Sequence, residues 1–249
     1  MKNCKNIPGY LLAKISAAGL LCLLISSCLK ENTNNNYTPP TALLSFIQAS
    51  PDEPPVDFFL NSNKVNNNSI YFGNNIDYVS AYAGTRTANF YTAGTANILF
   101  SGTISLNPNT AYSLFLANKS TSPEIVLLTD TLNAPPSGKA GLRFINLSPD
   151  ASNVSLAIQV DPIVISLLQL PQTLVTNEPY KGYSTFIPVA GKTTYNFEVI
   201  QTGTNTVLAT LPGVALDNGF VYTIWFGGLV ASTNNNDKLS VNIVTNAFF

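Results

Sequence analysis

Residues 44–52 read LSFIQASPD, and residues 142–150 read LRFINLSPD. Further matched pairs follow in the same order along both halves of the chain: Val56 with Val154, Ala83-Gly84 with Ala190-Gly191, Asn89-Phe90 with Asn196-Phe197, Gly94-Thr95 with Gly203-Thr204, and Tyr112 with Tyr222. Matched segments that drift apart through insertions in loops indicate two copies of one structural unit. We therefore expect one domain at residues 41–132 and a second at 140–249, joined by a short, proline-containing linker at 133–139.

Each copy consists of short segments rich in Val, Ile, Thr and aromatic residues, separated by Asn, Gly and Pro, a composition typical of strands and turns. In the second copy we expect strands at residues 141–147, 154–159, 163–168, 183–188, 194–201, 206–211, 220–227 and 239–244. Units of about 100 residues built this way predict an all-β fold, with two tandem immunoglobulin-like antiparallel β-sandwiches. Trp225, the single tryptophan, lies in an apolar run and is expected in the core.

The beginning of the chain is typical of an exported bacterial lipoprotein. Lys2 and Lys5 precede an apolar stretch at residues 15–25, and Ile25-Ser26-Ser27-Cys28 has the residue order of a lipobox. The apolar stretch is shorter than the about 20 residues that a membrane-spanning helix needs. We expect a lipoprotein signal peptide at residues 1–27, cleavage between Ser27 and Cys28, and acylation of the Cys28 thiol.

The segment after the cleavage site is polar and has no hydrophobic periodicity. Residues 28–40, with Asn, Thr and Pro abundant, are expected to form a flexible tether that begins at the lipidated cysteine. Such a tether could hold the first domain up to about 40 Å from the lipid. Acyl chains on Cys28 would anchor the protein permanently to the membrane without spanning it.

Composition excludes several classes of function. The chain has no histidine and a net charge of −1, so it lacks the commonest general base and metal ligand, and it lacks the basic footprint of a nucleic-acid-binding protein. Cys4 and Cys22 would leave with the signal peptide, so the folded part would have no disulfide or catalytic thiol. No nucleotide-binding loop or nucleophile elbow occurs. We expect no enzymatic activity, no metal, no cofactor and no nucleic-acid partner.

The acidic residues leave two alternatives. A hydrolase that uses carboxylates alone would draw on Asp52, Glu53 and Asp57 in the first copy and on Asp150 and Asp161 in the second. Asp52 and Asp150 each follow Ser-Pro at a strand exit, where a carboxylate accepts backbone N–H bonds, so a turn role is favoured for them. Calcium could bind the first three acids, but no glycine-centred calcium loop is present and a solvated acidic turn is favoured.

Aromatic residues and one short motif are the remaining candidate sites. Tyr71, Tyr78 and Tyr82 lie beside Asn and Asp residues, a combination that suits a platform for sugar rings, although aromatic residues at this spacing also fill sandwich cores. We expect at least one of Tyr78 and Tyr82 to be in the core. Asp130-Thr131-Leu132 resembles an O-glycosylation acceptor motif, with Thr131 as the acceptor.

The lipobox, the polar tether and the two copies that open with L-x-F-I-[QN]-x-S-P-D resemble a family of exported bacterial proteins called domain of unknown function 4397. The resemblance covers essentially the whole chain after the signal peptide, and it implies a lipoprotein of the Bacteroidetes type without implying a biochemical activity. Lys30-Glu31 resembles the short charged signals that direct such lipoproteins to the cell surface. Glu53 and Asp57 of the first copy correspond to Ala151 and Ser155 of the second.

The sequence therefore predicts a lipid-anchored protein of the cell envelope, attached to the outer membrane at the cell surface, with a non-catalytic binding or structural role. Its partners would be the membrane, through the lipid anchor, and a glycan or an envelope protein. The first alternative is a glycan-binding surface lipoprotein of a polysaccharide-uptake system. The second is the carboxylate-only hydrolase. Fold alone does not decide among these, because sandwiches of this kind host many functions.

Overall fold

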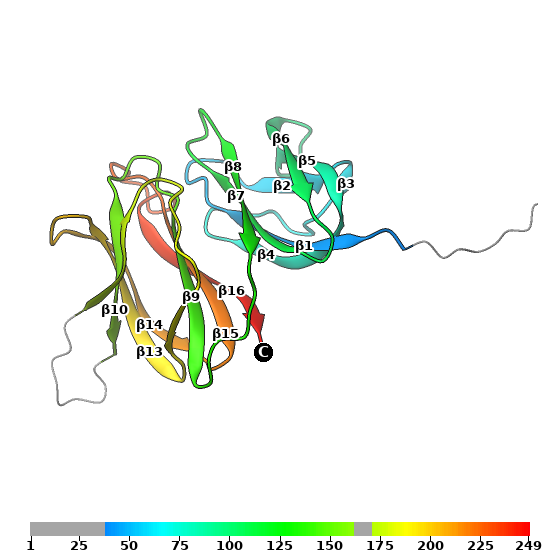
Figure 1. Ribbon diagram of the computed structural model, residues 1–249. Helices are drawn as coiled ribbons and strands as arrows, with labels where there is room; N and C mark the ends of the chain where they lie inside the picture. Colours follow the sequence, from blue (N-terminus) through cyan, green and yellow to red (C-terminus); the bar gives the residue numbers. More distant parts are fainter. Residues whose placement is uncertain (1–37, 162–170) are drawn as a thin grey trace, which may run out of the picture. The chain divides into compact units, whose positions relative to one another are not determined.

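The computed structural model describes residues 38–161 and 171–249 (Figure 1). Every helix or strand assigned within these ranges is a β-strand, and Pro39–Phe249 form one compact unit. Within the same ranges, no helix is long and apolar enough to cross a membrane. The expected signal peptide, the lipidated cysteine and most of the tether lie outside the described residues.

The first sandwich consists of two four-stranded sheets. One has the order β4-β1-β7-β8 and is made of β1 (Thr41–Gln48), β4 (Asn75–Tyr82), β7 (Ala111–Ala117) and β8 (Glu124–Asp130). The other has the order β3-β2-β5-β6 and is made of β2 (Val56–Leu60), β3 (Asn63–Lys64), β5 (Gly84–Thr92) and β6 (Ile98–Leu106). Phe46, Phe58 and Phe90 meet between the sheets with ring centroids 4.9–5.1 Å apart, so aromatic packing forms the centre of this core.

The second sandwich repeats this arrangement. One sheet has the order β12-β9-β15-β16 and is made of β9 (Lys139–Asn146), β12 (Ile187–Ala190), β15 (Phe220–Gly227) and β16 (Ser240–Phe248). The other has the order β11-β10-β13-β14 and is made of β10 (Val154–Val160), β11 (Gln172–Glu178), β13 (Thr193–Gln201) and β14 (Val207–Leu216). Phe144, Phe197 and Phe226 are fully buried in its core. The predicted fold of two tandem β-sandwiches is confirmed.

Most strand pairs are antiparallel, but one pair in each sandwich is parallel. β1 pairs with β7, and β9 pairs with β15, in the parallel sense. The first strand of each copy therefore lies in the middle of its sheet, beside a strand that comes late in the same copy. This long-range pairing closes each sandwich as a unit of its own.

The repeated motif has a structural role at the end of β1 and of β9. The side-chain oxygens of Gln48 and Asn146 accept hydrogen bonds from the backbone N–H of the serine two residues later. The hydroxyls of Ser50 and Ser148 donate to the backbone carbonyls of Asn118 and Gly228, just beyond the paired strand. Each bond occurs once per copy, so the motif repeats because it fastens the first strand to its parallel neighbour.

The strand predictions for the second copy are right for most elements and wrong in one region. The segments expected at residues 141–147, 154–159, 194–201, 206–211, 220–227 and 239–244 overlap β9, β10, β13, β14, β15 and β16. The strand expected at 183–188 shares only its end with β12, because Tyr183 makes a single bridge to Ile145 before the regular pairing begins. β11 was not expected, and the strand expected at 163–168 lies outside the described residues.

A third apolar cluster lies between the two sandwiches. This interdomain cluster consists of Ile47, Ala49, Phe115, Ala117, Leu128, Ile145, Leu147, Trp225 and Val244, with Phe72 and Val126 packed against it. Ile47 is paired with Phe115 across β1 and β7, and Ile145 is paired with Trp225 across β9 and β15. The same two positions of each copy therefore face each other. Trp225 is buried as expected, but in this cluster rather than inside the second sandwich.

Candidate functional site

A polar network lies beside the interdomain cluster and is centred on an ion pair. The Nη1 atom of Arg143 lies 2.7 Å from the Oδ1 atom of Asp130, and both side chains are almost completely buried. Arg143 also donates to the Thr223 hydroxyl, and Asp130 also accepts from the Ser113 hydroxyl. Because the carboxylate and the guanidinium satisfy each other in a dry environment, they hold the two sandwiches in one register.

Tyr78 belongs to this network. Its hydroxyl donates to Asp130 and accepts a hydrogen bond from the side-chain amide of Asn246, at 3.0 Å. Burial and the neighbouring Asp130 carboxylate raise the pKa of Tyr78 to about 12. Tyr78 therefore connects β4 of the first sandwich with β16 of the second through hydrogen bonds, and its hydroxyl is engaged within the protein.

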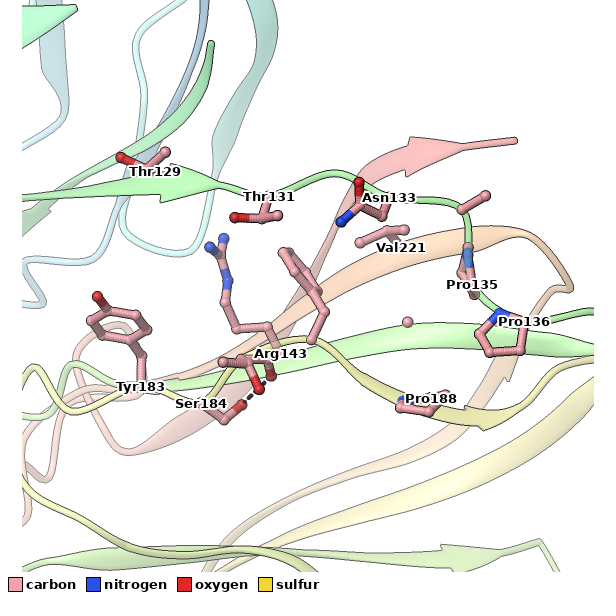
Figure 2. A pocket seen from close by; sticks show the side chains of 14 residues that line it. Thr129, Thr131, Asn133, Pro135, Pro136, Arg143, Tyr183, Ser184, Pro188 and Val221 are labelled. Carbon is pink, nitrogen blue, oxygen red and sulfur yellow. Dashed lines mark hydrogen bonds between the residues drawn. The ribbon is translucent and has the colours of Figure 1, made fainter. Parts of the chain in front are cut away.

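A groove runs beside the linker, with Arg143 at its base. This linker groove has a volume of about 450 Å³, within the range of small-molecule sites. Figure 2 shows the guanidinium of Arg143 directed toward Thr131, with Tyr183 on one side and the linker prolines Pro135 and Pro136 on the other. The guanidinium also lies 4.7 Å from the centroid of the Phe186 ring.

The linker groove combines an exposed ring with neutral polar groups. Tyr183 is 54% exposed, and the hydroxyl and amide side chains of Thr129, Thr131, Asn133, Ser184 and Thr185 line the same groove. The charge of Arg143 is already neutralised by Asp130, so the groove offers no free cation to an anionic ligand. It is suited to a neutral ligand that has both an apolar face and hydroxyl groups.

A second groove lies between loops of the two sandwiches. This Tyr71 groove has a volume of about 910 Å³ and is lined by Pro51, Asp52, Glu53, Pro54, Pro55, Tyr71, Phe72, Gly73, Asn234, Asn235, Asn236, Asp237, Lys238, Ser240 and Asn242. Tyr71 is 58% exposed. It differs from the linker groove in its charged lining, and the two grooves share no residue.

The three tyrosines of the candidate sugar platform do not come together. Tyr71 lines the Tyr71 groove, and Tyr78 is bound in the interdomain network. Tyr82 is 56% exposed and is the last residue of β4. It is four positions along the strand from Tyr78, a separation of about 13 Å. A single platform made of all three rings is therefore not formed, and Tyr71 is the member that lines a groove.

Asp52 and Asp150, two of the candidate catalytic carboxylates, have separate structural partners. Asp52 accepts hydrogen bonds from the backbone N–H and the hydroxyl of Ser120. Asp150 accepts from the backbone N–H of Val230 and pairs with Lys119. Both motif aspartates thus bind the turn that follows the parallel partner strand.

Asp57 is held in a different way. Burial raises its pKa, but the Gly94 N–H, Lys64 and Asn66 bind the carboxylate and bring the net pKa below its usual value. Among the described residues, no group of three or more Asp, Glu, Cys or His side chains could hold a metal ion. Of the three acids of the calcium alternative, Asp52 and Asp57 bind different partners. Asp161 directly follows β10, and its backbone N–H donates to the Thr194 carbonyl.

The two remaining candidate positions are the O-glycosylation acceptor Thr131 and the lipidation site Cys28. Thr131, the candidate O-glycosylation acceptor, is exposed and lines the linker groove, while the aspartate of the same motif, Asp130, is buried in its ion pair. Cys28 and the Ser27–Cys28 cleavage position lie outside the described residues.

Apart from Thr131, sequence patterns did not identify the residues of the linker groove as candidates for a site. Tyr183 and Phe186 lie before the edge strand β12, in a segment that alternation suggested was entirely strand. Arg143 stands where the first copy has Ser45, since both pair with a residue of the parallel strand at the same position. An arginine between the apolar residues Leu142 and Phe144 was the signal that could have indicated the buried ion pair.

Comparison with known families gives one match. Residues 42–157 match the model of the family described as Domain of unknown function (DUF4397). This match supports the resemblance of the chain to the DUF4397 family. It covers the first sandwich, the linker and the beginning of the second sandwich, and includes both copies of the opening motif. No curated protein matches the chain in sequence.

The solved structures that match the chain are distant from it in sequence. One is a family 26 carbohydrate-binding module from Eubacterium rectale Amy13K, solved in complex with maltoheptaose, with 10% identity and a TM-score of 0.28; the match covers 82% of this chain and 97% of that chain. Another comes from work on alpha-glucan recognition by family 41 carbohydrate-binding modules of streptococcal virulence factors, with 11% identity, a TM-score of 0.28, and 81% and 96% covered. Likenesses at this level carry no argument about the ligand of this chain.

Proposed function

We propose that this chain is an exported, lipid-anchored protein of the outer membrane that is displayed at the cell surface and binds a neutral saccharide in the linker groove without catalysis. The observation that carries the binding proposal is the exposed Tyr183 ring beside a row of uncharged hydroxyl and amide side chains. A pyranose ring has an apolar face that can stack on a tyrosine and hydroxyls that can bond to the polar side chains.

The rigidity of the groove supports this proposal. Its base, Arg143, is held by Asp130 and Thr223 and covered on one side by Phe186. The backbone N–H of Phe144 donates to the Ser184 hydroxyl, which in turn donates to the Thr185 carbonyl. A groove whose wall and base are fixed before binding loses little conformational entropy when it takes a ligand.

A non-catalytic role is supported by the positions and partners of the carboxylates near the linker groove. Retaining glycosidases need two carboxyl groups about 5–5.5 Å apart on either side of the scissile bond, and inverting enzymes need them about 6.5–9.5 Å apart. Asp130, which pairs with Arg143 at the base of the linker groove, is already engaged in that ion pair. Among the described residues, the lining of the groove includes no aspartate or glutamate, which favours binding over hydrolysis.

Two experiments test the two parts of the proposal. For the anchor, metabolic labelling with a fatty-acid analogue should label the wild-type protein, and Cys28→Ala should remove both the label and the membrane association. A Cys28→Ala variant that remains membrane-bound would refute the lipid anchor. For the ligand, the full chain purified in mild detergent is screened against a panel of neutral and charged oligosaccharides, and at least one neutral oligosaccharide should bind reversibly and remain uncleaved.

A further inference from the structure

Glu53, in the wall of the Tyr71 groove, has one buried carboxyl oxygen without a hydrogen-bond partner among the described residues. The residue is 9% exposed, and its Oε1 atom has no hydrogen-bond partner among the residues that the structure describes. Buried carboxylates are normally paired or hydrogen-bonded, because an isolated buried charge is costly. Glu53 departs from this rule at the edge of an open groove.

The charged neighbours of Glu53 do not supply the missing partner. Asp52 is adjacent, is bound by Ser120, and has the same sign of charge. Asp237 accepts a hydrogen bond from Ser232, and the Lys238 ammonium lies 3.2 Å from the Asn235 side-chain oxygen. The lining of the groove contains three acids and one lysine, so it has an excess of negative charge.

The other side chains of the Tyr71 groove are of the kinds that suit contact with a sugar ring. Tyr71 is exposed, and Asn234, Asn235, Asn236 and Asn242 present side-chain amides in the same groove. Amides can donate to and accept from hydroxyl groups, and an exposed tyrosine can stack on the apolar face of a pyranose. A ligand that also carries an ammonium group would give Glu53 the cationic partner that the protein does not provide.

We infer that the Tyr71 groove binds an amino sugar with a free ammonium group, which pairs with the Glu53 carboxylate while the ring stacks on Tyr71. The ligand class is saccharide, as in the proposed function, but the groove, the residues and the charge of the ligand are different. The raised pKa of Glu53, about 7, agrees with a carboxyl group that lacks a cation in the free protein. The second copy has Ala151 at this position, so it does not repeat the carboxyl group of this site.

The test compares two ligands that differ only in the ammonium group. A glucosamine tetramer and its fully N-acetylated form are titrated at neutral pH into the full chain in mild detergent, by isothermal calorimetry. The glucosamine tetramer should bind at least about tenfold more tightly than the acetylated tetramer, which is about 1.4 kcal/mol. Glu53→Gln should remove this preference, and Glu198→Gln, which removes the same charge from β13, should keep it.

Two further measurements distinguish binding of an amino sugar in the Tyr71 groove from binding in the linker groove and from binding of any ammonium group. Tyr183→Ala alters the linker groove and should leave the binding of the glucosamine tetramer unchanged, whether or not the linker groove binds a neutral saccharide. A lysine tetrapeptide supplies ammonium groups without sugar rings and should bind at least about tenfold more weakly than the glucosamine tetramer. Equal binding of the two tetramers, a preference that survives Glu53→Gln, or equal binding of the lysine tetrapeptide would overturn the inference.

Discussion

Asp130 and Arg143 form a buried ion pair between the two sandwiches, with the Oδ1 and Nη1 atoms 2.7 Å apart and side-chain exposures of 0% and 3%. The pair arises from complementary differences between the copies. Arg143 occupies the position of Ser45, because the two residues pair with Thr223 and Ser113 at the same place in the parallel strand. Asp130 of β8 is paired with Ala111, whereas a β-bulge in β16 leaves Asn246 unpaired in the corresponding region of the second copy. Two similar sheet faces thus meet, and one charge on each makes their contact specific.

Removal of one partner of this pair should destabilise the protein strongly. Asp130→Ala leaves the Arg143 guanidinium buried without its counter-charge, and we expect a loss of about 3–5 kcal/mol in the free energy of unfolding. The measurement is a denaturant titration of the full chain in mild detergent. Asp77→Ala is the matched control, because Asp77 is exposed and should change stability by less than about 0.5 kcal/mol. Equal effects of the two substitutions would show that the buried pair contributes nothing.

Both sandwiches should unfold in one transition. The interdomain cluster includes large buried side chains from each copy, among them Phe115 and Trp225, so separation of the domains would expose apolar surface on both. Trp225 fluorescence and far-ultraviolet circular dichroism should therefore change at the same denaturant concentration. Two resolved transitions would mean that the cluster couples the domains only weakly.

Truncation of the tryptophan tests the same interface by a different route. Trp225→Ala should lower the free energy of unfolding by about 3–5 kcal/mol, because it leaves a cavity in the interdomain cluster. Tyr71→Ala removes an exposed aromatic ring and should leave stability within about 0.5 kcal/mol of the wild type. Denaturant titrations that show no loss for Trp225→Ala would contradict the packing of the cluster.

Stability should depend on pH through Glu53. Burial and the adjacent Asp52 raise the pKa of Glu53 from 4.5 to about 7 in the folded state. The folded state therefore holds this proton more tightly than the unfolded state does. The contribution of Glu53 to stability is fully present below about pH 4.5 and is lost as the pH rises through about 7. Denaturant titrations across this range should show the decline in the wild type and a smaller decline in Glu53→Gln; parallel curves for both would disprove the assignment.

Much of the fold could be predicted because the sequence repeats itself. The LSFIQASPD and LRFINLSPD segments are alike because the same backbone and side-chain hydrogen bonds are needed at the end of β1 and of β9. Gly94 and Gly203 match because both adopt positive φ, 73° and 79°, in equivalent turns. Local geometry of this kind requires particular residue types, so it can be recognised from the sequence.

The interface and the grooves could not be predicted in the same way. β9 has buried apolar residues on both faces, since Leu142 and Phe144 face the sandwich core and Ile145 faces the interdomain cluster. Alternation therefore could not show which face was covered by the other domain. Tyr183 and Glu53 are in grooves formed by segments far apart in the chain. A local sequence pattern cannot show that such segments lie next to each other in the folded protein.

The most direct test of the central claim compares two equally exposed tyrosines in saccharide binding. Tyr183 lines the linker groove and is 54% exposed, while Tyr82 is 56% exposed and lies at the end of β4. The neutral oligosaccharide selected by the screen is titrated into the full chain and into the Tyr183→Ala and Tyr82→Ala variants. We predict that Tyr183→Ala weakens binding by at least about tenfold, and that Tyr82→Ala changes it by less than about twofold. Unchanged affinity in Tyr183→Ala, or a loss confined to Tyr82→Ala, would contradict saccharide binding in the linker groove.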